Sequence, residues 1–230
     1  MFKIKQKIIA TVATIALTFS IGTPAFATTN TSDFTIIQDA GNGNVSFAYS
    51  ATPEKNLDEL NIEAENYVRE LQENVIKPRV GVTYHDSLSD TTSTAYKQGY
   101  VKASFQTYVY VDSFPGYIVQ INGSSQDQWT GSLSVTSIDS SDTFTLNTFL
   151  LADLTLSAPP GVSATTVGNS LTINYPTVTN KSTYTHSFTG IEATTSVLGS
   201  VNKYTHTHSN TFLFGNHTES CMASDSITIW

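Results

Sequence analysis

Cysteine is the rarest residue in this 230-residue sequence, in which Cys221 is the only one. A single cysteine excludes an intramolecular disulfide, so stability has to come from a packed core. About 200 residues suffice for one or two such domains. Free cysteine is among the most buried residue types, which favours burial of Cys221 but leaves pairing with a second chain open.

Basic residues are also few, with 11 Lys and Arg against 19 Asp and Glu. Three of them, Lys3, Lys5 and Lys7, precede an apolar run that ends in small residues, which predicts a signal peptide over residues 1–27 and a secreted, extracellular protein. Its removal leaves eight basic and nineteen acidic residues, a net charge of −11. This charge disfavours nucleic acid and anionic lipid as partners. No second long apolar run follows to hold the chain in a membrane.

Motifs for catalysis are missing as well. No Gly-x-Ser-x-Gly stretch marks a nucleophile elbow, and no glycine-rich phosphate loop occurs. The C-terminal third has few acidic residues from which a pair of carboxylates for glycoside cleavage could come, because residues 154–230 contain only Glu192, Glu219 and Asp225. The sequence therefore predicts a protein that is not an enzyme.

Serine and threonine are what the chain has in abundance. There are 27 Ser and 35 Thr, and from residue 80 onward apolar and polar residues alternate in short runs such as 99–112. Alternation with a period of two predicts strands that each have one buried and one hydroxyl-rich face. We expect a mainly β fold, an antiparallel sandwich or an elongated β-sheet domain, with the polar clusters "NGSSQD" (122–127) and "DSSD" (139–142) as turns between strands.

The N-terminal part has a different pattern. After the signal peptide, two apolar runs flank a Gly-Asn-Gly turn at 41–43, which predicts a β-hairpin. An amphipathic helix is predicted over about residues 53–76, with Thr52 as the cap and Pro53 at its first position. The predicted regions are an N-terminal hairpin plus helix at 28–78, a β-rich region at 79–157, and a Ser/Thr-rich β region at 158–230 that packs with the preceding one.

The stretch "YTHTHSNTFLFGNH" at 204–217 carries three of the five histidines. A two-residue turn at Gly215 and Asn216 would place His206 opposite Asp225, with His208 on the same face. Two imidazoles spaced in this way are typical ligands of a sheet-based zinc site, with Asp225 as a third ligand or an orienting carboxylate. His186, in a second Tyr-Thr-His copy, is a further candidate ligand. The alternative is that these histidines lie on a partly polar sheet face, with one of them held by Asp225, and that the protein has no cofactor.

Aromatic residues gather just before the middle of the chain. Exposed rings in such a cluster would stack on sugars or anchor a protein partner, whereas buried rings would fill the core. The candidate platform consists of Tyr108, Tyr110, Phe114, Tyr117 and Trp129.

Three functions compete. The first is a secreted, non-enzymatic β-rich interaction protein that recognises a cell-surface, glycan or protein partner. The second is a secreted β-pore-forming or membrane-active toxin, because Ser/Thr strands with two different faces also suit a transmembrane barrel. The third is a metal-binding protein that uses the His-x-His strand. Export, acidity and the lack of catalytic motifs favour the first.

Overall fold

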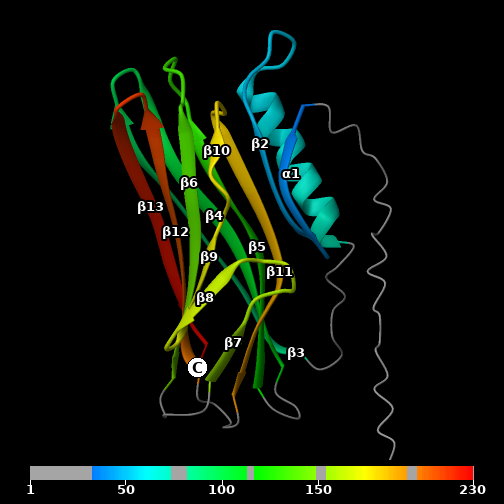
Figure 1. Ribbon diagram of the computed structural model, residues 1–230. Helices are drawn as coiled ribbons and strands as arrows, with labels where there is room; N and C mark the ends of the chain where they lie inside the picture. Colours follow the sequence, from blue (N-terminus) through cyan, green and yellow to red (C-terminus); the bar gives the residue numbers. More distant parts are fainter. Residues whose placement is uncertain (1–32, 74–81, 113–116, 149–153, 196–200, 230) are drawn as a thin grey trace, which may run out of the picture.

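Two antiparallel sheets form the body of the molecule, with one helix against the outer side of the first (Figure 1). This is the mainly β architecture that the sequence predicts. The computed structural model describes residues 33–73, 82–112, 117–148, 154–195 and 201–229. The predicted signal peptide and Phe114 lie outside these residues.

The first sheet has seven strands in the order β1-β2-β11-β5-β4-β3, with β7 beside β11, and the second has six in the order β13-β12-β6-β9-β8, with β10 beside β6. Both sheets combine strands from the regions before and after residue 158. The bounds of the strands are β1 (Thr35–Gly41), β2 (Asn44–Tyr49), β3 (Val82–Tyr96), β4 (Gly99–Asp112), β5 (Tyr117–Trp129), β6 (Ser137–Thr148), β7 (Leu154–Ser157), β8 (Ala164–Val167), β9 (Ser170–Asn174), β10 (Val178–Thr179), β11 (Thr183–Thr195), β12 (Val201–Phe214) and β13 (His217–Thr228).

The alternation in the sequence sets which side chains face the core. On β4, Val101, Ala103 and Phe105 are buried, whereas Lys102 and Ser104 between them lie on the outer face. Apolar residues of this kind from both sheets form one continuous core between them. Burial of this shared apolar surface holds the two sheets together.

Two polar stretches depart from the prediction. Residues 122–127 and 139–142 were expected to be turns, but β5 and β6 run straight through them. Turn prediction fails here because Asp127 and Asp142 are fully buried and take part in hydrogen bonds between strands. Buried polar groups of this kind are stable inside a strand when partners from other strands satisfy them.

The single helix of the described residues, α1 (Leu57–Glu73), begins four residues later than the predicted start at Pro53. Asn56 and Glu59 form a reciprocal cap: the backbone N–H of Glu59 donates to Asn56 Oδ1 and that of Asn56 donates to Glu59 Oε2, both at 3.0 Å. Such a capping box fixes the first turn. Thr52 instead closes a separate turn, in which its hydroxyl accepts from the Lys55 N–H.

A second, smaller hydrophobic cluster attaches the helix to the first sheet. Leu60, Ala64 and Leu71 of α1 pack on Phe47 and Tyr49 of β2. Every residue of β2 is buried, because the helix covers one face of this strand and the main core covers the other. The helix therefore stands as a wall beside the outer face of the sheet, as Figure 1 shows.

Hydroxyl side chains cover much of the outer face of the second sheet along strands β12 and β13. Thr207 pairs with Ser224 at 2.9 Å, and Thr211 pairs with Ser220 at 2.9 Å. Cross-strand hydroxyl pairs of this kind stabilise a sheet modestly while they keep its surface polar.

Within the part of the chain that the structure describes, no helix is long and apolar enough to cross a membrane.

Candidate functional site

The β12–β13 hairpin has the predicted register. Gly215 takes a positive φ of 63° in the turn, Phe214 lies opposite His217, and His206 lies opposite Asp225. His206 and His208 point into the sandwich, where both are fully buried. The turn residues and the alternation in the sequence thus predicted this hairpin correctly.

The carboxylate that contacts His206 is a different one from that predicted. Asp142 of β6, on the other side of β12, lies 2.9 Å from His206 Nε2. Asp225 is only partly buried, and its Oδ1 accepts from the N–H of Ser226. The position of Asp225 opposite His206 in the hairpin does not by itself make Asp225 the hydrogen-bond partner of His206. Strand β12 has β13 on one side and β6 on the other, and it is β6 that carries its acidic side chain, Asp142, into the core.

His208 lies between two carboxylates at the centre of the sandwich. Its Nδ1 is 2.8 Å from Asp142 Oδ1 and its Nε2 is 2.8 Å from Asp127 Oδ1. A neutral imidazole has only one N–H, so donation to both carboxylates requires the doubly protonated ring. Burial by itself would lower the pKa of His208, but Asp127 and Asp142 outweigh it and raise this pKa to about 10. His208 is thus a buried cation that joins the two sheets.

Each carboxylate has several donors. Asp142 Oδ2 accepts from the hydroxyls of Ser125 and Tyr175, both at 2.7 Å, in addition to the two imidazoles on Oδ1. Burial favours the protonated acid, yet His208 and His206 outweigh it and hold the pKa of Asp142 well below its usual range. For Asp127, His208 and His186 likewise overcome burial and lower the pKa to about 2. Both groups are therefore carboxylates at neutral pH.

His186 and His206 have the opposite protonation state. Burial is the largest influence on both rings and lowers their pKa below the ordinary value of 6.5. Nε2 of His206 donates to Asp142, so its Nδ1 accepts from the hydroxyl of Thr107 at 2.7 Å. His186 is arranged similarly, with Nε2 directed at Asp127 and Nδ1 toward Ser46 at 3.0 Å. The network thus holds two carboxylates and one imidazolium.

The structure brings together three of the four predicted metal ligands, His186, His206 and His208, and leaves Asp225 apart. Their ring nitrogens all point at carboxylate or hydroxyl oxygens. No group of three or more His, Cys, Asp or Glu side chains within the described ranges is arranged to hold a metal ion. The three histidines instead form a buried hydrogen-bonded network with Asp127 and Asp142, and the predicted contact between a histidine and Asp225 is replaced by these.

The predicted aromatic platform divides between the two faces of the sheet. Trp129 is only 2% exposed, because the alternation of β5 points it inward, where it packs against Tyr96 and Phe214. An exposed platform that includes Trp129 is therefore wrong. Tyr108 and Tyr110 are on the outer face of β4 and are half-buried. Tyr117 begins β5, and its side chain is outside the described part.

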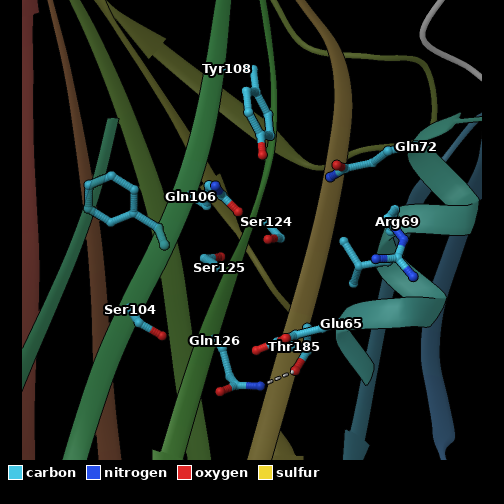
Figure 2. A pocket seen from close by; sticks show the side chains of 12 residues that line it. Glu65, Arg69, Gln72, Ser104, Gln106, Tyr108, Ser124, Ser125, Gln126 and Thr185 are labelled. Carbon is cyan, nitrogen blue, oxygen red and sulfur yellow. Dashed lines mark hydrogen bonds between the residues drawn. The ribbon is translucent and has the colours of Figure 1, made fainter. Parts of the chain in front are cut away.

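An open groove lies between α1 and the outer face of β4 and β5 (Figure 2). It encloses about 440 Å³, within the range of small-molecule binding sites. Its floor consists mainly of outward-facing residues of β4 and β5, with Thr185 of β11 beside them, and its other side consists of helix residues spaced four and three apart on one face. The polar side chains that line it include Glu65, Arg69, Ser104, Gln106, Tyr108, Ser124 and Gln126.

Three hydrogen bonds hold the helix and strands in place around the groove. Gln72 Nε2 donates to the carbonyl of Gly123 on β5 at 2.6 Å. Gln126 Nε2 donates to Thr185 of β11 at 3.2 Å and to the hydroxyl of Tyr49 at 2.9 Å. Fixed side chains of this kind reduce the entropy that a ligand has to offset on binding.

Sequence reasoning predicted Tyr108 as a binding residue but missed the rest of the groove. The helix residues Glu65 and Arg69 look like part of an ordinary solvated face, and Gln106 and Gln126 look like polar positions of an exposed strand. The signal that joins them is tertiary, because it depends on where the helix packs on the sheet. No protein-family model matches the chain, and neither a curated protein nor a solved structure matches it.

Proposed function

We propose that this chain is a secreted, non-enzymatic recognition protein that binds an extracellular partner in the groove between α1 and strands β4 and β5. The observation that carries the proposal is the groove itself: an open cavity whose polar side chains come from a helix and from neighbouring strands of one sheet. Sites of this kind, with a few convergent polar groups on fixed elements, are typical of binding proteins.

The location of the titratable residues supports binding rather than catalysis. His186, His206 and His208, with Asp127 and Asp142, have no exposed surface. A general base has to come within hydrogen-bonding distance of its substrate, and these five side chains contact one another instead. The best-organised acid–base groups of the fold are thus out of reach of a ligand.

The chemistry of β12 favours recognition over membrane insertion. The buried face of this strand carries His206, His208 and Asn210 between its aromatic residues. A barrel strand that turned this face to lipid would place all three in hydrocarbon, where polar and ionisable groups are costly. The proposal therefore rests on the groove and not on the hairpin.

A binding experiment tests the proposal. Labelled protein that begins at residue 28 is incubated with bacterial cell walls and with animal cells, and bound protein is measured against concentration. We expect saturable binding to one of these surfaces, and a loss of at least tenfold in affinity for the Arg69→Ala, Gln106→Ala double variant.

The matched control carries Thr207→Ala and Thr211→Ala on the outer face of the other sheet. It should bind as the parent protein does, and circular dichroism should show all three proteins folded. Absence of saturable binding to every surface, or binding that the groove variant leaves unchanged, contradicts the proposal.

A further inference from the structure

The groove offers groups that both donate and accept hydrogen bonds. The amide of Gln106 and the hydroxyls of Ser104 and Ser124 have this dual capacity, whereas Gln126, whose Nε2 already donates to Tyr49 and Thr185, offers its carbonyl oxygen as an acceptor. Sugar hydroxyls have the same dual capacity, so each can donate to one protein group and accept from another. A floor of amides and hydroxyls is thus complementary to a surface rich in hydroxyl groups.

The charges of the groove disfavour an ionic ligand. Glu65 and Arg69, one turn apart on α1, contribute one charge of each sign. The chain as a whole is acidic, with a formal net charge of −8. An anion would meet a single arginine with a carboxylate beside it, and the bidentate clusters typical of phosphate or sulfate recognition have no counterpart among the residues that line the groove. A neutral ligand meets no such penalty.

Peptides and apolar molecules also fit poorly. Strands β4 and β5 are hydrogen-bonded to each other, and their other edges are occupied by β3 and β11. An extended peptide therefore has no open strand edge to join at the groove floor. The apolar lining residues Val68 and Phe105 are buried, with 6% and 5% of their surface exposed, and so supply no apolar anchor point.

Tyr108 adds an aromatic surface at one end. It follows Ser104 and Gln106 at intervals of two on β4, so the three side chains point from the same strand face (Figure 2). The apolar body of a tyrosine ring packs against the C–H face of a sugar while its hydroxyl stays in polar surroundings. Aromatic and polar groups thus lie in one row along the floor.

We propose that the groove binds a neutral oligosaccharide, with the ring of Tyr108 against one sugar face, and with the amide of Gln106 and the carbonyl oxygen of Gln126 on the sugar hydroxyls. This inference rests on the proposed function and specifies the chemical class of its ligand. Glu65 and Arg69 on the helix then contact the edge of the ligand opposite the strands.

The experiment separates the ligand class from the function. Cell walls and cells that bind the protein are treated with periodate, which cleaves vicinal diols of glycans, or with a protease. We expect periodate to abolish groove-dependent binding and protease to leave it intact. Neutral oligosaccharides released from the binding surface should compete, and their sialylated or sulfated forms should compete at least tenfold less well.

Variants then test the contacts by titration calorimetry with a competing oligosaccharide. Tyr108→Ala should weaken binding about 5- to 10-fold through the lost ring contact, and Tyr108→Phe should stay within about twofold of the parent. Gln106→Ala should cost roughly fivefold, the loss of one hydrogen bond. Thr207→Ala on the other sheet is the matched control and should have no effect.

The outcomes distinguish the two proposals. Binding that the groove variant removes but that only protease destroys would overturn the glycan and leave the recognition function in place. Binding of neutral sugars that ignores Tyr108 and Gln106 would overturn the site. No groove-dependent binding to any surface would overturn both.

Discussion

The groove and the first-sheet part of the buried network are built from alternate residues of the same strands. Each strand turns one polar side chain outward to the groove and the next one inward to the network. Inward-facing residues satisfy one another in a space without solvent, whereas outward-facing residues keep hydrogen-bonding capacity for a ligand. These neighbours on β4 and β5 are Gln106 and Thr107, Ser124 and Ser125, and Gln126 and Asp127. On β11, His186 faces the network in the same way, but Thr185 beside it is buried and accepts from Gln126.

The difference shows that burial, more than residue type, decides what a polar side chain contributes. A buried hydrogen bond is costly to leave unmade, because the remaining partner stays desolvated. A hydroxyl or amide at the surface exchanges its partner for water with little change in free energy. Substitutions on the two faces of one strand should therefore have unequal effects.

The largest expected effect comes from removal of the central carboxylate. Asp142→Asn leaves the His208 imidazolium with one counter-charge, and breaking such a buried ion pair costs about 3–5 kcal/mol. Urea unfolding measures the free energy. Asp225→Asn is the control, since Asp225 is the acidic residue opposite His206 in the hairpin, and we expect a change below about 0.5 kcal/mol. Equal losses for the two variants would contradict the assignment of Asp142 as the partner.

The buried network should make the free energy of unfolding decrease both when the pH rises above neutrality and when it falls below. The raised pKa of His208 contributes stability that is complete below the unfolded value of 6.5 and is lost as pH rises toward about 10. His186 and His206, whose pKa values are lowered, oppose folding once pH falls below 6.5. The lowered pKa of Asp127 removes further stability as pH falls through 3.8 toward about 2.

We therefore expect maximal stability near neutral pH, with losses on both sides, in urea titrations across the pH range. Histidine Cε1–H NMR signals give a direct check. The signal of His208 should retain the protonated shift up to at least pH 8, while those of His186 and His206 should titrate below the ordinary histidine value of 6.5. A His208 signal that titrates near 6.5 would refute the buried imidazolium.

A smaller effect separates two adjacent residues of β4. Thr107→Val removes the hydroxyl that donates to His206 Nδ1 and should cost about 1–3 kcal/mol, because that nitrogen stays buried without a donor. Gln106→Ala faces the groove, so its effect on the free energy of unfolding should remain within about 0.5 kcal/mol. If the Gln106 variant were the less stable of the two, the contrast between the faces would be wrong.

The smallest effect belongs to the hydroxyl-covered face of the second sheet. Thr207→Val breaks the exposed pair with Ser224, where water replaces the lost hydroxyl, and valine is a favourable strand residue. The change in unfolding free energy should lie within about 0.5 kcal/mol of zero by urea denaturation. A loss as large as that of Thr107→Val would show that these hydroxyl pairs behave as core contacts.

Local patterns predicted the parts of this fold that depend on neighbouring residues. The Gly215–Asn216 turn and the alternation on either side of it were enough to pair His206 with Asp225 across the hairpin. The long strands β5 and β6 were harder, since Asp127 and Asp142 resemble turn residues until their imidazole partners, 64 or more positions away for His206 and His208, are known. The groove was hidden for the same reason, because helix and strand residues meet there only after α1 packs on β2.

The small hydrophobic cluster under α1 holds this helix, which forms one side of the groove, separately from the main core. This cluster shares no residue with the main core, so the helix can open while the two sheets remain closed. Backbone amides of α1 should then exchange with deuterium faster than those of β5, and a ligand that spans helix and strands should slow their exchange in proportion to its occupancy. The amide exchange of this one helix would thus report occupancy of the groove without any label on the ligand.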